Sequence, residues 1–260
     1  MTDAIIVHQV SKQFGKNTDP TWKRLWVHLK NHNNGNHSGA SSAKMVIAVD
    51  KVSFTIHEGE IFGVLGPNGG GKSTLIRLIS TLLLPDYGDI TVFGYNVEHQ
   101  PMQVQKLINR VSVEASFFKK LSPMENLLYG ARLYGINGAD TRRQVVEILT
   151  RLGLEKRSIY SPMEEMSRRM QQQVAIARAL LSKPRLLLLD EPTTGLDPRS
   201  KREVQAVVKE LRDTAGTTIL LTTHDMNEAE ALCNRIAIMD KGRVMALDTP
   251  EALKGMIFSS

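Results

Sequence analysis

A glycine-rich segment with one lysine stands at residues 66–74, which read GPNGGGKST directly after the apolar run IFGVL. This spacing predicts a strand, a tight turn and a helix start, in which successive backbone N–H groups point at phosphate oxygens. The Lys72 ammonium is expected to reach the β- and γ-phosphates, and the Ser73 hydroxyl is expected to bind Mg²⁺. The segment predicts a site for a nucleoside triphosphate, formed by Gly66, Pro67, Asn68, Gly69, Gly70, Gly71, Lys72, Ser73 and Thr74.

A pair of acidic residues ends a second informative segment, residues 185–192, which read RLLLLDEP. Four consecutive leucines predict a strand buried on both faces of a parallel sheet. A carboxylate at the carboxyl end of such a strand lies where open α/β sheets bind their ligands. We expect Asp190 to bind Mg²⁺ and Glu191 to orient or deprotonate the attacking water. The alternative is a surface turn after a core strand, which two adjacent acids beside a phosphate-binding loop disfavour.

Two further segments narrow the family. Residues 193–198 read TTGLDP, and an apolar strand at residues 217–223 ends in the pair His-Asp. In this order the segments resemble the nucleotide-binding domain of ABC transporters. GPNGGGKST resembles its Walker A motif, LLLLDEP its Walker B motif, GLDP its D-loop and TTHD its switch histidine. The resemblance runs from about residue 46 to residue 254 and includes the first strand.

The resemblance implies roles for individual residues. It implies ATP and Mg²⁺ as cofactors, with Lys72, Glu191 and His224 as the catalytic side chains. His224 would contact the γ-phosphate, and Asp197 would couple two sites across a dimer. Taken alone, a histidine at a strand end is more often a hydrogen-bonded structural residue, so its place in the set of motifs supports the functional role.

The resemblance also implies an α/β fold of the P-loop NTPase type. A RecA-like parallel sheet is expected to carry the phosphate-binding loop, with an N-terminal antiparallel β-lobe and an inserted helical subdomain. We assign the chain to one ABC ATPase domain, with β-lobe strands in residues 1–65, the RecA-like core in residues 66–96 and 167–260, and the helical subdomain in residues 97–166. In this last part apolar residues recur at helical spacing, namely Val104, Leu107, Ile108, Val145, Val146, Ile148 and Leu149.

The segment before the helix predicted at residues 174–180 departs from the family pattern. ABC domains carry Ser-Gly-Gly-x-Gln there, and its N–H groups close on the γ-phosphate bound by the opposite subunit. This chain keeps the serine as Ser167 but has Arg168 and Arg169 in place of the glycines. An arginine there either blocks the close approach of backbone to phosphate or binds the phosphate through its guanidinium. Both outcomes remain open, and the intact Walker B motif favours a working ATPase.

Two other contacts of the family are harder to place. The Q-loop glutamine, which senses Mg²⁺ and touches the membrane partner, has no counterpart in residues 111–118. Glu114 is the nearest candidate, because a carboxylate still binds Mg²⁺ although it donates no hydrogen bond; the alternative is a solvated loop acid. For the aromatic ring that stacks on adenine the candidate is Phe14, and the alternative is a plain core phenylalanine.

An insertion at about residues 16–45 separates the first two strands and carries much of the positive charge. Residues 1–44 hold six Lys/Arg against two acids, so +4 of the net charge of +6 lies there. One predicted helical face gathers the apolar residues Trp22, Leu25, Trp26 and Leu29. Such a helix with a basic remainder fits a membrane surface or a membrane partner, and it equally fits packing on the β-lobe of the chain itself.

Composition agrees with a subunit that works beside a membrane and not within it. The chain has 260 residues, 42% of them hydrophobic, which is enough for a full core. Its apolar runs are far shorter than the ~18 residues that a membrane span needs, and its first residues do not resemble a signal peptide. The single cysteine, Cys233, suits a reducing compartment and is expected to pack as a small apolar residue. We therefore expect a peripheral position at the cytoplasmic face of the membrane.

The expected function is that of the ATP-hydrolysing subunit of an exporter, with the ABC-2-type branch as the closest resemblance. Its expected partners are a separate transmembrane permease and a second ATP-binding subunit, either an identical chain or a paralogue, and no nucleic acid is expected. One alternative is a soluble ABC ATPase that acts on ribosomes or nucleic acid, although the sequence shows neither a second cassette nor a long coiled coil. Another is a weakly hydrolysing regulatory subunit, which Arg168 and Arg169 would explain.

Overall fold

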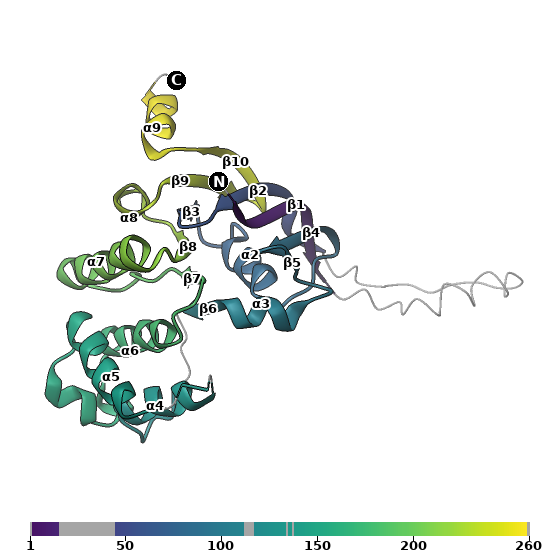
Figure 1. Ribbon diagram of the computed structural model, residues 1–260. Helices are drawn as coiled ribbons and strands as arrows, with labels where there is room; N and C mark the ends of the chain where they lie inside the picture. Colours follow the sequence, from purple (N-terminus) through teal and green to yellow (C-terminus); the bar gives the residue numbers. More distant parts are fainter. Residues whose placement is uncertain (1, 16–44, 112–116, 134, 137, 259–260) are drawn as a thin grey trace, which may run out of the picture.

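The computed structural model describes most of the chain (Figure 1). The described residues are 2–15, 45–111, 117–133, 135–136 and 138–258. The basic insertion with its predicted Trp/Leu helix lies outside them, and so does Glu114. The expectations for these two features stay predictions.

The larger of two sheets has six strands in the order β10-β9-β3-β8-β7-β6. Neighbouring strands are parallel except for β9 and β10. All residues of β7 and β8 are buried, which explains the four leucines of β7 and the apolar centre of β8. The predicted parallel sheet of an α/β fold is confirmed. Its strands are β3 (Ile61–Leu65), β6 (Ile108–Val111), β7 (Leu186–Asp190), β8 (Thr218–Thr223), β9 (Arg235–Asp240) and β10 (Arg243–Asp248).

Helices cover both faces of this sheet, with α2 and α3 on one side and α6, α7 and α8 on the other (Figure 1). Strand β7 shows the two layers, because Leu186 and Leu188 belong to one core and Leu187 and Leu189 to the other. Each face of the strand thus buries its own set of leucines under a different set of helices. These helices and the C-terminal one are α2 (Lys72–Ile79), α3 (Pro101–Leu107), α6 (Arg168–Leu181), α7 (Pro198–Ala215), α8 (Met226–Leu232) and α9 (Pro250–Phe258).

The smaller sheet is antiparallel and has the order β2-β1-β4-β5. Its strands are β1 (Asp3–Phe14), β2 (Val46–His57), β4 (Tyr87–Val92) and β5 (Tyr95–Asn96). Phe54 of β2 stacks on Phe62 of β3, with ring centroids 5.1 Å apart, and so joins the two sheets. The two sheets do not follow the residue limits expected for the lobes. Strand β3 was expected in the β-lobe but lies in the larger sheet, and β4 and β5 were expected in the RecA-like core but lie in the smaller sheet. Pairing partners such as Ile5 and Val92 are far apart along the chain, and local patterns carry no signal for such pairs.

The helical part of the chain lies apart from the smaller sheet, at the lower left of Figure 1. It comprises α4 (Pro123–Leu133), α5 (Ala139–Arg151) and two short 3₁₀ helices, η1 (Lys156–Tyr160) and η2 (Met163–Glu165), packed with α6. Val145 and Leu149 are buried, which confirms the helical spacing there. The helix expected at Ile108 is wrong, because this residue begins β6 and pairs with Leu186. A short apolar run does not distinguish a helix end from a strand start.

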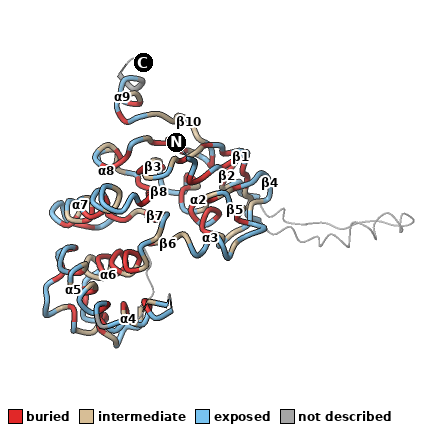
Figure 2. Tube along the Cα trace, viewed as in Figure 1, coloured by how far each residue is buried: buried red, intermediate tan, exposed pale blue. Residues whose placement is uncertain are grey.

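Two expectations from composition can be compared with the structure. Cys233 is buried in the same core as Ala229, Leu232 and Ile236, and burial raises the pKa of its thiol. Buried residues concentrate in the central strands and in α2 and α6 (Figure 2). Within the described ranges, no helix combines the length and apolar character that crossing a membrane requires.

Candidate nucleotide site

The phosphate-binding loop joins β3 to α2. Gly69 and Gly71 have φ angles of 79° and 101°, in the left-handed region that favours glycine, and Gly71 is the N-cap of α2. A Cβ on Gly66 would collide with the carbonyl oxygen of Met239, and one on Gly71 would collide with that of Ala48. The loop is therefore packed against β9 and β2, and the first N–H groups of α2 remain for an anion.

Lys72 holds a buried positive charge at this loop. Its side chain is 4% exposed. The Nζ atom donates to the carbonyl oxygens of Gly66 (2.8 Å) and Pro67 (3.0 Å) and lies 3.4 Å from Glu191 Oε1. A buried ammonium needs such partners, because removing an unpaired charge from water is costly. The predicted phosphate contact and the predicted catalytic carboxylate are thus neighbours.

A cluster of oxygen atoms stands beside the loop at the ends of β7 and β8. Ser73 Oγ donates to Asp190 Oδ1 at 3.0 Å, and Thr222 Oγ1 donates to the same oxygen at 2.8 Å. Asp190 and Thr222 are both buried. A hydroxyl and a carboxylate beside a phosphate-binding loop are the hard oxygen ligands that Mg²⁺ prefers. The donor set therefore fits this ion.

Glu191 has an unusual backbone for a residue with a side chain. Its φ angle is 50°, in the left-handed region, which costs about 1–3 kcal/mol for a residue other than glycine. Its N–H donates to the carbonyl oxygen and to the Oγ1 of Thr222, both at 3.1 Å. The carboxylate accepts from Thr194 Oγ1 at 3.0 Å, in addition to its contact with Lys72. Strain held in place by several hydrogen bonds is typical of functional positions.

His224 completes the group at the end of β8. Its Nδ1 lies 3.4 Å from Glu191 Oε2, and its side chain is 48% exposed. The next residue, Asp225, caps α8 by accepting from the N–H of Asn227 at 3.0 Å. The strand and the capped helix therefore fix the position of the imidazole, which faces the Glu191 carboxylate and remains open to a ligand.

The arginines at the signature position are held differently from one another. Ser167 is the N-cap of α6, and its Oγ accepts from Met170 N at 3.3 Å. Arg168 is exposed. Arg169 turns toward the D-loop, where its Nη1 lies 3.1 Å from Asp197 Oδ2. Asp197 in turn is the N-cap of α7. The structure thus links the signature turn and the D-loop of one chain by an ion pair.

Phe14 lies at the end of β1 with an exposed ring, and the Lys12 ammonium is 5.9 Å from the ring centroid. It pairs with Val46 of β2, two residues from Ala48, whose carbonyl oxygen lies close to the phosphate-binding loop at Gly71. The ring is therefore on the strand pair that borders the loop. Its role in adenine stacking stays a prediction.

Several polar residues of the site were not singled out by the sequence patterns. Thr222 binds both Asp190 and the Glu191 backbone, and Thr194 binds the Glu191 carboxylate. Thr193 Oγ1 donates to the buried Glu228 Oε1 at 2.7 Å and so ties this segment to α8. The available signal was the position of Thr222 directly after the apolar residues 219–221 of a buried strand, since a buried hydroxyl requires a partner.

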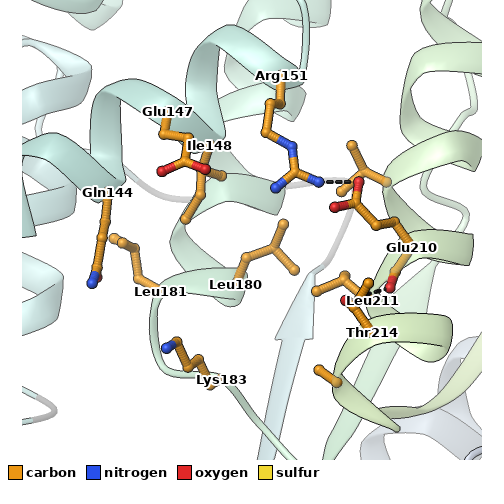
Figure 3. Close-up of a pocket in the computed structure, with 12 residues that line it drawn as sticks. Gln144, Glu147, Ile148, Arg151, Leu180, Leu181, Lys183, Glu210, Leu211 and Thr214 are labelled. Atoms are coloured by element: carbon orange, nitrogen blue, oxygen red, sulfur yellow. Dashed lines mark hydrogen bonds and ion pairs between the residues drawn. The ribbon is translucent and has the colours of Figure 1, made fainter.

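A cavity of about 400 Å³ lies elsewhere, between α5, the end of α6 and α7 (Figure 3). Its floor is apolar, with Leu180 and Leu211, and an ion pair between Arg151 and Glu210 spans it. No sequence-predicted site residue lines it. It is therefore distinct from the nucleotide site.

Comparison with known families agrees with this geometry. The chain matches the ABC transporter family over residues 49–194, which include the phosphate-binding loop and Glu191. The chain belongs to the ABC transporter family. Within this family it represents the ATP-binding domain, since solved ATP-binding cassettes share its fold.

Relatives in the ABC transporter family include ATP-binding proteins of several bacteria. The daunorubicin/doxorubicin resistance ATP-binding protein DrrA of Streptomyces peucetius is 42% identical over 82% of this chain and 64% of the relative. The linearmycin resistance ATP-binding protein LnrL of Bacillus subtilis (strain 168) is 39% identical over 77% of this chain and 64% of the relative. The ABC transporter ATP-binding protein NatA of the same strain is 37% identical over 81% and 85%. The chain thus spans slightly less than two thirds of the length of the first two.

Among solved structures, the dimeric bacterial ABC transporter cassette MJ0796 superimposes with a TM-score of 0.78 at 25% identity, covering 95% of this chain and 98% of the cassette. A dimeric post-hydrolysis state of the same cassette, bound to ADP and phosphate, gives a TM-score of 0.76 at 25% identity with the same coverage. These likenesses confirm the predicted P-loop NTPase fold.

Proposed function

We propose that this chain is the ATP-hydrolysing subunit of an exporter and powers transport through a separate transmembrane partner. The observation that carries the proposal is that Lys72, Ser73, Asp190, Glu191 and His224 meet at one loop. These residues come from three separate segments of the chain and supply the parts that phosphoryl transfer to water requires. The names of the relatives, which include drug-resistance and Nod factor export ATP-binding proteins, support export as the use of this ATPase.

Each side chain has a step to perform in hydrolysis. The loop N–H groups and Lys72 bind the phosphates, and Ser73 and Asp190 would hold Mg²⁺. The ion, when bound, would neutralise charge on the phosphate oxygens. Glu191 accepts a hydrogen bond from the attacking water and takes its proton as the bond to the γ-phosphorus forms. The bond from the γ-phosphorus to the bridging oxygen breaks, and ADP leaves with that oxygen. His224 lies beside this carboxylate and donates to the transferred phosphoryl group.

A second ATP-binding subunit is part of the proposal. The signature turn at Ser167 belongs to α6, whereas the phosphate-binding loop precedes α2, and the MJ0796 cassette to which this chain is similar was solved as a dimer. We propose that two subunits meet so that the signature turn of one faces the nucleotide of the other. The partner is a second copy of this chain or a paralogue.

A groove between β6 and α4 is the proposed contact for the transmembrane partner. It has a volume of about 540 Å³ and is bordered by Ile108 and Arg110 on one side and by Phe118, Tyr129 and Leu133 on the other. The last three are exposed, and the rings of Phe118 and Tyr129 contact edge to face with centroids 5.2 Å apart. Exposed apolar side chains gathered at one groove are typical of a protein interface. On this proposal the chain binds peripherally at the cytoplasmic face of the membrane.

The proposal is tested by capture of the membrane partner. A tagged Glu191→Gln variant, incubated with ATP and gently solubilised membranes, is expected to hold nucleotide and retain a polytopic membrane protein identified by mass spectrometry. A Lys72→Ala/Glu191→Gln double variant, which loses the phosphate contact, is the matched control. Recovery of only ribosomal or nucleic-acid-bound proteins would contradict export.

A second pair of variants tests the groove. Leu133→Asp places a charge among its exposed apolar side chains and is expected to abolish capture of the membrane protein. Met245→Asp makes the same change at a similarly exposed methionine on β10 and is expected to leave capture intact. If the Leu133→Asp variant captured the membrane protein as well as the Met245→Asp variant does, the groove would be excluded as the contact for the transmembrane partner.

A further inference from the structure

The loop from Glu191 to Asp197 connects the proposed catalytic carboxylate to the start of α7. Within it, Thr194 N donates to Glu191 O at 3.3 Å and Leu196 N donates to Thr193 O at 3.1 Å. Thr194 Oγ1 also holds the Glu191 carboxylate. The loop is therefore a compact, hydrogen-bonded turn.

Side chains from the first turns of α6 contact this loop at both ends. Near Glu191, Gln172 Nε2 donates to the carbonyl oxygen of Pro192 at 3.3 Å in a buried position. At the far end, Arg169 Nη1 pairs with Asp197 Oδ2 at 3.1 Å. Arg169 and Gln172 are three residues apart and share one face of the helix. The signature helix thus contacts the catalytic loop through two side chains.

Asp197 is already engaged by its own helix. Its Oδ1 accepts from the N–H groups of Arg199 and Ser200, both at 3.1 Å, and its Oδ2 accepts from Ser200 Oγ at 2.8 Å. These bonds hold the carboxylate in position independently of Arg169. The ion pair therefore joins two rigid elements, the first turn of α6 and the first turn of α7.

The charge pattern of α6 indicates why the pair matters. The helix begins with Arg168 and Arg169 and has no acidic residue in its first turn, although positive charge is unfavourable at a helix N-terminus. Asp197 compensates Arg169. Arg168 is exposed and forms no ion pair with the residues that the structure describes. Of the two neighbouring arginines, Arg169 is therefore the one that is tied to the loop from Glu191 to Asp197.

We propose that Arg169 is a positioning residue for ATP hydrolysis, which holds the loop from Glu191 to Asp197 and thereby keeps the Glu191 carboxylate in place. The side chain at the second signature position does not act on a nucleotide in this account; it acts on the catalytic loop of its own chain. The inference rests on the ATPase step of the proposed function and is independent of export and of the transmembrane partner.

The test compares Arg169→Met, Arg169→Lys and Arg142→Met in the full chain, by steady-state ATP turnover and by binding of a fluorescent ATP analogue. Arg169→Met is expected to lower kcat about tenfold while KM and analogue affinity stay within about twofold, because the phosphate-binding loop is untouched. Arg169→Lys keeps the charge and is expected to restore most of kcat. Arg142→Met, at an exposed arginine of α5, is the control and is expected to match the wild type.

A second set of variants changes Asp197, the other partner of the ion pair, so that misfolding of one variant does not decide the result. Asp197→Asn retains an oxygen that caps α7 but loses the charge, and is expected to lower kcat as Arg169→Met does. The double variant Arg169→Met/Asp197→Asn is expected to be no slower than either single variant, because both remove one interaction.

The contrary outcomes are distinct. Wild-type kcat in Arg169→Met, an equal loss in Arg142→Met, or multiplied losses in the double variant would each overturn the positioning role while leaving the ATPase proposal intact. A wild-type chain that binds the analogue but releases no phosphate would overturn the ATPase proposal itself and, with it, this inference.

Discussion

The phosphate-binding loop and the signature turn are both built at the start of a helix, α2 in one case and α6 in the other. They differ in how they are surrounded. Around the loop, Lys72 and Asp190 are buried, and the loop backbone presses on β2 and β9. At the signature turn, Arg169 and Asp197 are 39% and 44% exposed in their side chains.

This difference in packing explains which residues the family pattern keeps in this chain. At the loop a Cβ on Gly66 or Gly71 has no room, so no side chain replaces these glycines without displacing a strand. At the signature turn the side chains reach solvent, so arginine replaces glycine without a clash and finds a carboxylate. The consequence is that the nucleotide site keeps the standard residues, whereas the signature turn has acquired a new contact.

The largest effect is expected from the buried charge. Lys72→Ala removes the ammonium that meets Gly66 O and Glu191, and it is expected to lower kcat/KM about 10²–10³-fold, the cost of losing one preorganised phosphate contact. Lys209→Ala, at an exposed lysine of α7, is the control and should turn over ATP like the wild type. Phosphate release measures both. Equal rates would show that the loop lysine does not contact the transferred group.

A smaller effect on stability sharpens the contrast in packing. Gly66→Ala forces a Cβ against the Met239 carbonyl oxygen and is expected to lower the free energy of unfolding by about 1–3 kcal/mol. Gly130→Ala in α4 meets only the Arg178 side chain at 3.6 Å and is expected to be neutral or slightly stabilising. Urea unfolding compares the two. A Gly66→Ala variant as stable as the wild type would contradict the close packing of the loop.

The smallest effect concerns acid stability at the signature turn. Hydrogen bonds from Ser200, with the Arg169 charge, lower the pKa of Asp197 below its ordinary value of 3.8. Because the folded pKa is below the unfolded one, the ionised carboxylate stabilises the fold above this ordinary value, and the contribution is lost as the pH falls through the folded pKa. The difference in Tm between wild type and Asp197→Asn should therefore be largest near pH 6 and shrink toward pH 3. A constant difference would show that the charge has no part in it.

Much of the site was predictable because its residues are close along the chain or follow buried strands. The spacing of Gly66, Lys72 and Ser73 predicts the loop, and the leucine run of β7 places Asp190 and Glu191 at the edge of the sheet, where the structure has them. The α/β fold with its parallel sheet followed from the same segments.

Contacts between distant side chains were not predictable. The ion pair from Arg169 to Asp197 and the bond from Gln172 to Pro192 depend on how α6 lies against the loop, which local spacing does not encode. The pairing of β4 with β1, and not with β3, likewise depends on the tertiary arrangement. From the sequence, Arg169 was expected either to block the approach to a phosphate or to bind it. In the structure its partner is instead the Asp197 carboxylate.

The most direct test of the account is to replace the Glu191 carboxylate and measure ATP turnover. In the full chain, Glu191→Gln keeps the size and backbone bonds of the residue but removes the proton acceptor. It is expected to reduce ATP turnover at least 100-fold while the affinity for ATP stays within about twofold. Glu164→Gln, at an exposed acid of η2, serves as the control and should retain wild-type turnover. A Glu191→Gln variant that hydrolyses ATP at the wild-type rate would contradict the assignment of this site.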